Sequence, residues 1–507
     1  MIRSSLAALV LIGLAAACRE LPETATSPRR PLAATTQSQT STHNPTWWAK
    51  YEQLAANGPG SGGEATGSTV VGANVDVSNE CGPQSETYVT LDPNGPRTLT
   101  AGANEIFRLP MRGYFSSDGG ASWGGVDLPL PPPLAGTNDT RFGSDPSLAF
   151  DTQGNVFYSF IVVFFSAGAG HSINGTEMAV ARSTDGGHTW PALTQFSFEG
   201  GENHFNDKPM IAADQSRASP LRDHVYAAWD AASGGSIGGG IRVAHSADHG
   251  ASFAVTRADN PGGPGRSIGA VPFLAPTGTV YVAWNDFDAN VIAFNRSFDG
   301  AATWDGQRTI APKQIAFDIG IPAESFRRAL VYPACDTDRS DEAHHGRLYC
   351  SWMDLNAAGH TSILLAFSDD GGATWSSPAP VGHQGSGTDR FNHWLSVDPV
   401  TGNVTVSYYD ATGFTTNVLF SRSTDGAATW QSDVPITTAT SNEHDCNGLF
   451  PCPGIDYGNQ YGDYEGLVAF GGVAHPIWTD SRRNLVPSSG CTGNLTMEEV
   501  FTATASY

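Results

Sequence analysis

The sequence predicts an all-β fold made of repeated four-stranded sheets, and three observations support this. One eight-residue phrase occurs six times, short apolar runs come in pairs separated by tight turns, and glycine is frequent, with 58 residues. Charged residues make up only 15% of the chain, which suits many short strands and argues against a helical protein. Self-similarity at intervals of roughly 50–70 residues indicates a repeat architecture.

The repeated phrase reads S-x-D-x-G-x-[TS]-[WF]. Its aspartate can hydrogen-bond the backbone of its own turn, its glycine allows a backbone angle that other residues resist, and its aromatic residue can pin the turn onto a sheet. The phrase resembles the Asp-box, or BNR repeat, of the sialidase superfamily. We interpret its aspartates as folding residues, not catalytic ones: Asp118, Asp185, Asp248, Asp299, Asp370 and Asp425.

Paired apolar runs indicate how many sheets there are. Each pair has a turn rich in Asp, Gly or Pro and ends in most cases on an aromatic residue. The seven pairs are Tyr88–Gly102, Pro146–Phe160, Pro209–Trp229, Val271–Trp284, Leu330–Trp352, Trp394–Tyr409 and Glu465–Trp478. We therefore expect a β-propeller of four-stranded blades, with seven blades preferred and six, as in true sialidases, the alternative. The last blade lacks a fourth strand, so Thr69–Ser78 should pair with the C-terminal strand and close the ring.

The N-terminus is typical of an exported protein. Arg3 precedes an apolar run that ends in Ala15-Ala16-Ala17-Cys18, too short to span a bilayer. These residues resemble a bacterial lipobox, although Ala15 stands where Leu is usual. The resemblance implies a lipoprotein signal at 1–18, lipidation of Cys18 and an outer-membrane or surface location; an ordinary signal peptide is the alternative. Residues 19–65 are polar and form a flexible tether, and 66–507 form the propeller.

Six cysteines remain after Cys18, and an even number in an exported chain suggests disulfides. Fifteen pairings exist. Proximity in the sequence favours Cys335–Cys350 and Cys446–Cys452, which leaves Cys81 with Cys491.

The charge balance limits the partners. With 27 Lys and Arg against 50 Asp and Glu, the net charge is −23, which disfavours nucleic acid and anionic membrane surfaces. We expect a glycan ligand, contact with a membrane only through the lipid anchor, and a monomer. No cofactor is required, although acidic loops leave room for structural calcium.

The starts of the innermost strands and the ends of the second strands should meet on one face, away from the repeated phrases. The starts are polar, and carboxylates beside aromatic residues are what carbohydrate chemistry uses. An aromatic-Asp pair recurs where second strands end, which favours a structural role there. The less repetitive candidates for ligand binding are Arg141, His204, Lys208, Arg328, Arg390, His393, Tyr461, Glu465 and Arg482.

The sialidase resemblance implies three arginines that hold a substrate carboxylate, a Tyr–Glu nucleophile pair and an acidic Asp. Arg328, Arg390 and Arg482 are candidates for the arginines. Tyr461 or Tyr464 would be the nucleophile with Glu465 or Glu324, and Asp145 the acid; Asp207 is a further catalytic candidate. Phe107-Arg108-Leu109-Pro110 looks like the motif of the first sialidase arginine. It lies so close to the first repeated phrase that we interpret the match as coincidental.

Three functions remain open. The first is an anchored glycosidase, of exo-sialidase type or a relative that cleaves acidic glycans. The second is a non-catalytic propeller that binds glycans or proteins. The third is another hydrolase or metal enzyme using His204, Asp207 and His393, although no tight H-x-H spacing supports a metal site. Fold alone does not choose among them.

Overall fold

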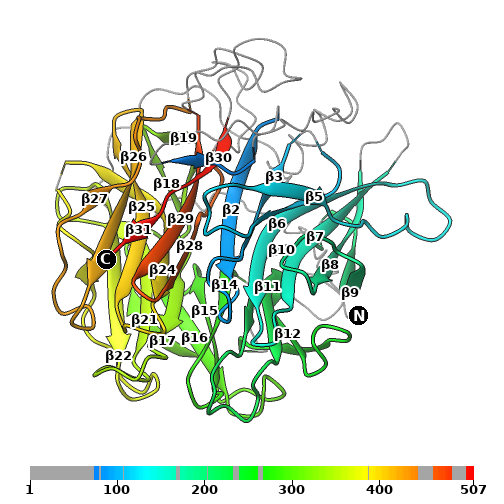
Figure 1. Cartoon of the computed structure of the whole chain (residues 1–507), viewed down its shortest axis with the longest axis horizontal. Helices are drawn as coiled ribbons and strands as arrows, with labels where there is room; N and C mark the ends of the chain where they lie inside the picture. The colour runs from blue at the N-terminus through cyan, green and yellow to red at the C-terminus, as the bar shows by residue number, and fades with distance from the viewer. Residues whose placement is uncertain are drawn as a thin grey trace, which may run out of the picture.

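A computed structural model describes residues 74–78, 82–106, 108–166, 172–202, 204–231, 239–260, 266–385, 387–443, 461–481 and 498–507. Every regular element in these ranges is a β-strand (Figure 1), which confirms the all-β prediction for this part of the chain. Within the same ranges no helix is long and apolar enough to cross a bilayer. The predicted signal segment and tether lie outside the described residues.

Six antiparallel sheets each contain four strands in sequence order. The first three are β2 (Gln84–Leu91), β3 (Leu99–Glu105), β4 (Arg112–Ser116) and β5 (Gly124–Asp127); β6 (Thr140–Phe150), β7 (Val156–Phe165), β8 (Ile173–Ser183) and β9 (Ala192–Gly200); and β10 (Asn206–Ala213), β11 (Val225–Ala231), β12 (Gly240–Ser246) and β13 (Ala254–Arg257). The next three are β14 (Ser267–Leu274), β15 (Val280–Asp286), β16 (Val291–Ser297) and β17 (Arg308–Pro312); β20 (Ala334–Thr337), β21 (Leu348–Leu355), β22 (Thr361–Ser368) and β23 (Ala379–Pro380); and β24 (Asp389–Val397), β25 (Val404–Thr412), β26 (Thr415–Ser423) and β27 (Val434–Pro435).

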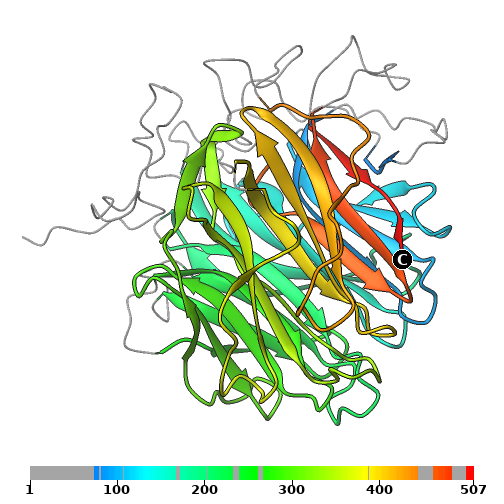
Figure 2. The same ribbon diagram turned by 90° about the vertical axis from the view of Figure 1, so that its left-hand side faces the viewer.

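The last sheet joins the two ends of the described chain. Its order is β28 (Gly466–Phe470), β29 (Val473–Asp480), β30 (Glu499–Thr502) and β1 (Val75–Asp76), with β31 (Ala505–Ser506) also paired to β29. Val75 lies opposite Thr502 in an antiparallel ladder, so the N-terminal segment supplies the outer strand. This sheet lies beside the first one, and Figures 1 and 2 show the red and blue strands as neighbours. A separate hairpin, β18 (Asp318–Ile321) and β19 (Glu324–Leu330), precedes β20.

The apolar core lies between neighbouring sheets. The second strands of four sheets each carry a tryptophan that is fully buried: Trp229, Trp284, Trp352 and Trp478. Strands covered on both faces read as nearly continuous apolar runs, which is why the runs were visible in the sequence. Four-stranded antiparallel sheets that contact one another in succession are consistent with a propeller.

The six repeated phrases form the turns between the third and fourth strands of the six sheets. In the second sheet, Ser183 Oγ donates to Asp185 Oδ1 (2.6 Å) and accepts from the Gly187 N–H (3.0 Å). The Asp185 carboxylate then accepts from the N–H and hydroxyl of Thr189 (2.9 and 2.7 Å). The other five turns repeat these bonds. The aspartates are thus engaged in their own turns, as a folding role requires.

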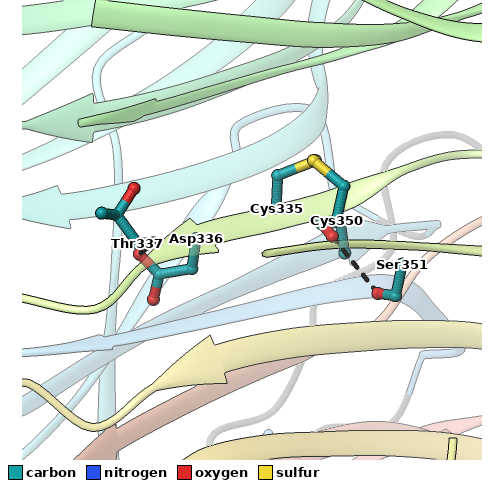
Figure 3. The surroundings of a disulfide bond; sticks show 6 residues. Cys335, Asp336, Thr337, Cys350 and Ser351 are labelled. Atoms are coloured by element: carbon teal, nitrogen blue, oxygen red, sulfur yellow. Dashed lines mark hydrogen bonds between the residues drawn. A yellow bond between two sulfur atoms is a disulfide. The ribbon is translucent and has the colours of Figure 1, made fainter. Parts of the chain in front are cut away.

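One predicted disulfide is confirmed. Cys335 on β20 lies directly opposite Cys350 on β21, and the two sulfurs are bonded (Figure 3). The other four paired candidates, Cys81, Cys446, Cys452 and Cys491, lie outside the described residues.

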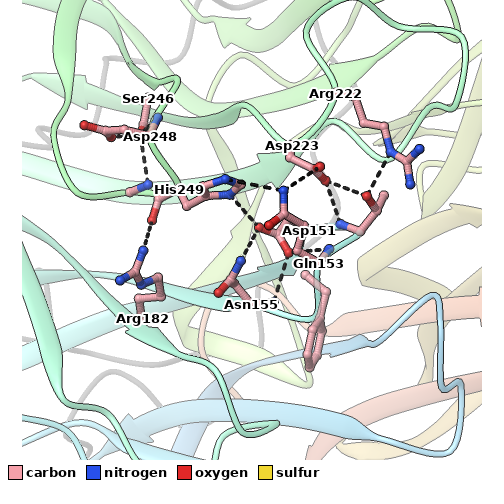
Figure 4. A network of polar contacts seen from close by, with 12 residues as sticks. Asp151, Gln153, Asn155, Arg182, Arg222, Asp223, Ser246, Asp248 and His249 are labelled. Carbon is pink, nitrogen blue, oxygen red and sulfur yellow. Dashed lines mark hydrogen bonds and ion pairs between the residues drawn. The ribbon is translucent and has the colours of Figure 1, made fainter.

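A polar network joins the second and third sheets (Figure 4). The fully buried Asp151 accepts from the N–H groups of Gln153 and Asn155 (both 2.9 Å) and from Asn155 Nδ2 (2.6 Å). Its other contact is His249 Nδ1, 3.0 Å away, in the repeated phrase of the next sheet. Arg182 also donates to the His249 carbonyl (3.0 Å). Asp151 therefore holds its own turn and the neighbouring sheet at once.

We expect Asp151→Ala to lower the free energy of unfolding by about 2–4 kcal/mol, because four partly buried donors lose one shared acceptor together. The matched control is Asp92→Ala in the corresponding turn of the first sheet, where the carboxylate accepts from the Asn94 N–H. That change should cost about 1 kcal/mol or less. Thermal melts of both variants beside the wild type provide the measurement, and equal losses would contradict the bridging role.

Candidate functional site

The innermost strands share a left-handed residue two positions before the apolar run. It is Glu86 (φ 55°) in β2, Asp145 (φ 60°) in β6, Lys208 (φ 45°) in β10 and Asn392 (φ 41°) in β24. The register of all four strands shifts there. Glycine takes the same position in β14 and just before β28, as Gly269 and Gly462. Left-handed backbone is costly for non-glycine residues and gathers at functional sites, so this ring of bulges marks the candidate site.

Side chains from these bulges meet in what we call the central cluster. Its members are Glu86, Asn104, Asp145, Asp207, Lys208, Asp230, Arg327, Tyr332, Trp394, Asp463 and Tyr464. They come from four of the sheets, from β19 and from the segments just before β20 and β28, although they are far apart in the sequence. All are buried or nearly so.

One amide holds two of the acids. Asn104 on β3 donates from Nδ2 to Glu86 Oε2 (2.6 Å) and more weakly to Asp145 Oδ1 (3.4 Å). Its Oδ1 accepts from the Asp145 N–H (2.7 Å), which fixes the orientation of the amide. Asp145 also accepts from the Ser144 hydroxyl (2.6 Å) and from the Lys208 N–H (3.2 Å). Asp145 is therefore a fixed carboxylate at the centre of the group.

Three neighbouring acids hold protons unusually tightly. Burial, followed by the charges of Asp463 and Asp145, raises the pKa of Glu86 well above its usual value. Burial, followed by the charges of Asp230 and Asp145, also raises the pKa of Asp207 well above its usual value. Burial raises the pKa of Asp230 in the same way. Acids kept protonated beside a carboxylate are what general acid–base chemistry at neutral pH needs.

Two cations lie among these acids. Arg327 Nη2 is 2.5 Å from Asp463 Oδ2 and 4.0 Å from Glu86 Oε1. Lys208 Nζ lies 4.0 Å from the centre of the Tyr464 ring and 4.3 Å from that of Tyr332. Burial lowers the pKa of Lys208 to about 8. In the described part of the chain this ammonium group has no hydrogen-bond partner.

The tyrosine beside Glu465 is Tyr409, not Tyr461. Tyr409 OH donates to Glu465 Oε1 (2.6 Å), and Thr87 OH bonds the other carboxylate oxygen. Tyr461 OH instead bonds the hydroxyls of Thr416 and Ser441, each at 2.8 Å. Tyr461 is connected to this pair through its ring, which stacks on that of Tyr409 with centroids 4.8 Å apart. The other tyrosine candidate, Tyr464, donates to the Pro146 carbonyl (3.1 Å).

We expect Glu465 to make stability fall as the pH rises. Burial raises its pKa from 4.5 to about 7, so between these values the folded chain binds more protons than the unfolded chain, and the slope of stability with pH is negative. Glu465→Gln should reduce the loss of unfolding free energy over this pH range by up to about 3 kcal/mol, since one pKa unit is worth about 1.4 kcal/mol. Denaturant unfolding from about pH 4.5 to 8 measures it. Parallel curves for variant and wild type would contradict this expectation.

Two of the three predicted arginines lie in the described residues, and each is paired with an acid. Arg390 Nη2 pairs with Asp410 (3.0 Å) and Arg328 Nη2 with Asp318 (3.0 Å). Arg108, of the motif-like segment, precedes β4 and pairs with Asp127 on β5 (3.1 Å). Arg141 lies on β6, and Arg482 lies outside the described residues.

The metal hypothesis gains no support from the described residues. They contain no group of three or more His, Cys, Asp or Glu side chains placed to hold an ion. His204 is exposed just before β10, whereas His393 is buried on β24. Burial lowers the pKa of His393 to about 4, so its ring is neutral at pH 7. Glu324, the alternative partner, is buried on β19.

Sequence reasoning missed several members of the central cluster: Glu86, Asn104, Asp230, Arg327 and Tyr332. Glu86 had a usable signal, since it stands two residues before Tyr88 just as Asp145 stands two before Ser147. Arg327 stands next to the candidate Arg328 in the sequence, but only the structure shows that Arg327, and not Arg328, pairs with an acid of the central cluster. Asp145, Asp207, Lys208 and Tyr464 are the sequence candidates that the structure brings together.

Comparisons with known proteins yield structural likenesses only. Neither protein-family models nor curated protein sequences match this chain. A leech intramolecular trans-sialidase is 12% identical over 77% of this chain and 72% of its own, with a TM-score of 0.44. The Hadza microbial sialidase Hz136 is 14% identical with a TM-score of 0.42; the match spans 65% of this chain and 63% of the sialidase, less than two thirds. A Penicillium chrysogenum α-L-arabinanase is 12% identical over 85% and 97%, with a TM-score of 0.43. With every TM-score below 0.5, we derive no activity from them.

Proposed function

We propose that this chain is a glycoside hydrolase whose reacting groups are carboxyl groups of the central cluster. The observation that carries the proposal is that Asp145, held by Asn104 and the Lys208 N–H, lies beside Glu86 and Asp207, two acids whose pKa burial raises. Glycosidases of most families use such a pair. One acid protonates the leaving oxygen, and one carboxylate acts as nucleophile or activates water.

The roles follow from the surroundings of each group. Asp207 is the proton donor, because burial and the neighbouring Asp230 and Asp145 raise its pKa, as a general acid requires. Asp145 is the carboxylate, since it accepts hydrogen bonds from the Ser144 hydroxyl and two N–H donors. The sialidase resemblance implied that Asp145 is the acid, whereas this proposal gives that role to Asp207. Glu86, on the other side of Asp145, is the second candidate for the donor.

A sialidase-type mechanism is the more specific version of this proposal. It requires a Tyr–Glu nucleophile, which Tyr409 and Glu465 would supply more directly than Tyr461 and Glu465. It also requires free arginines, and it would act on sialosides or other acidic glycans. Substrate binding by Arg141, His204 and Arg482 remains part of this version.

The architecture and location are proposals too. Seven blades are supported by contacts that run from innermost strand to innermost strand in the order β2, β6, β10, β14, β20, β24, β28 and back to β2.

We propose lipidation of Cys18 and a cell-envelope location, at the outer membrane or surface. Cys18→Ala should release the protein from washed membranes, and an unchanged membrane fraction would oppose lipidation.

The test of activity is turnover of chromogenic glycosides by the purified full-length protein. The panel includes neutral hexosides and pentosides, uronides and a sialoside, with Asp207→Asn, Glu86→Gln, Tyr409→Phe and Tyr461→Phe beside the wild type. Turnover that Asp207→Asn abolishes supports the assigned donor, and loss only in Glu86→Gln would transfer that role. Loss in both tyrosine variants supports the sialidase version. Turnover of none of the glycosides opposes the enzyme and favours the non-catalytic binding propeller.

A further inference from the structure

Several buried polar atoms at the central cluster have no hydrogen-bond partner within the described ranges. They are Lys208 Nζ, Asp463 Oδ1, Asn392 Oδ1 and His393 Nε2. Lys208 is only 2% exposed, and the other three residues are no more than 9% exposed. Buried polar groups are nearly always satisfied, so a set of orphan atoms in one place calls for a missing partner.

These atoms belong to one locality. Lys208 interacts electrostatically with both Asp463 and His393. Asn392 donates from Nδ2 to the carbonyl of Gly462, the residue before Asp463 (2.9 Å). That bond fixes the amide orientation, so the free Asn392 Oδ1 is an acceptor. The locality therefore offers one strong donor, the Lys208 ammonium group, beside the acceptors of Asn392 and Asp463.

The charges around Lys208 disfavour an anionic ligand. Five acids interact with it electrostatically, namely Glu86, Asp145, Asp207, Asp230 and Asp463. Of these, Asp463 is ion-paired with Arg327, and Asp145 accepts three hydrogen bonds. An incoming carboxylate would gain Lys208 but would face Asp145 and Asp463 at short range, where like charges repel strongly. A hydroxyl group has no such conflict, because it can donate to an acceptor and accept from the ammonium group.

Among the described residues, three arginines that could hold a carboxylate are already paired with acids. Arg327, Arg328 and Arg390 pair with Asp463, Asp318 and Asp410, respectively. Bidentate recognition of a carboxylate needs the guanidinium edge that these pairs use. At these three arginines, a ligand carboxylate would therefore have to displace a partner that is already in place.

We propose that the central cluster binds a neutral, hydroxyl-rich sugar residue through Lys208, Asn392 and Asp463, in preference to a sialic or uronic acid. This inference rests on the proposed function, in that it takes the cluster to be a glycan site. The sequence led us to include acidic glycans among the expected ligands, and this inference replaces them with neutral glycans.

Binding, not turnover, tests the inference, so that a protein without activity still gives an answer. The full-length protein is applied to an array of neutral glycans and their counterparts that carry a sialic or uronic acid at one position. We expect the neutral members to bind at least about tenfold more tightly than the acidic ones. Their affinity should change little between about 0.05 and 0.5 M salt, because salt screens attraction between charges and a neutral glycan carries none. Preference for the acidic members overturns the inference even if glycosidase activity is found, and binding to no glycan overturns it together with the glycan site.

Two variants locate the ligand. Lys208→Met should weaken neutral-glycan binding at least about tenfold. The control is Asp369→Asn, because Asp369 is exposed and lies in a repeated phrase at the other end of its sheet. This control should change binding less than about twofold. Asn392→Gly is the second probe, because glycine suits the left-handed backbone, as at Gly269 and Gly462, and removes only the side chain. It should weaken binding about fivefold or more and remain folded. Wild-type affinity in both cluster variants would overturn the assignment.

Discussion

Asp145→Asn is expected to lower kcat/KM on the preferred glycoside by about 10³-fold or more. The substitution keeps the size of the side chain and removes the charge that a nucleophile or general base must carry, and general acid–base groups typically contribute 10²–10⁴-fold. An amide could still accept from the Ser144 hydroxyl and the Lys208 N–H, which now hold the carboxylate at 2.6 and 3.2 Å. Initial rates over a range of substrate concentrations measure the loss and divide it between kcat and KM.

The division is informative because a merely positional role would mainly raise KM. Asp369→Asn, with the same chemical change on an exposed residue, should leave kcat/KM within about twofold of the wild type. The melting temperature of Asp145→Asn should stay close to that of the wild type, since removing one of several clustered acids relieves repulsion. A folded Asp145→Asn protein with more than a tenth of the wild-type kcat/KM would contradict the catalytic assignment.

The repeating parts of the fold could be predicted because their causes are local. In every repeated phrase, the serine hydroxyl and the aspartate carboxylate bond to residues two or four positions away, so the turn is encoded wherever the phrase occurs. The apolar runs likewise fix strands that are buried on both faces. The pairing of Val75 with Thr502 is far from local, but the missing fourth strand of the last sheet left only one place for it.

The site was predicted only in part because it depends on backbone bulges and on register. A left-handed residue at Glu86 or Asn392 turns one side chain out of the alternation that a strand pattern assumes. Sequence spacing therefore placed Tyr461 beside Glu465, whereas the antiparallel strands bring Tyr409 there. The same limit applies to adjacent arginines, since Arg327 pairs with Asp463 and Arg328 with Asp318.

Arg327→Met is expected to destabilise the fold by about 3–5 kcal/mol, the usual cost of removing one partner of a buried ion pair. Arg327 is about nine-tenths buried and lies 2.5 Å from Asp463, and it is the only cation bonded to that carboxylate in the described part of the chain. Without it, Asp463 would keep the Tyr332 hydroxyl (3.2 Å) as a neutral donor. Glu86, 4.0 Å from the guanidinium group, would lose an attractive charge as well.

The double variant Arg327→Met/Asp463→Asn separates loss of charge balance from loss of packing. If the cost comes from the unpaired Asp463 carboxylate, the second substitution should recover about half of it or more, because the charge that remained buried is gone. Thermal and denaturant unfolding of the two single variants and the double variant complete the cycle. Additive losses would mean that the pair contributes packing alone. One oxygen of the Asp463 carboxylate has no hydrogen-bond partner in the described residues. Recovery of stability without recovery of glycan binding would show that this carboxylate is needed for the ligand rather than for the fold.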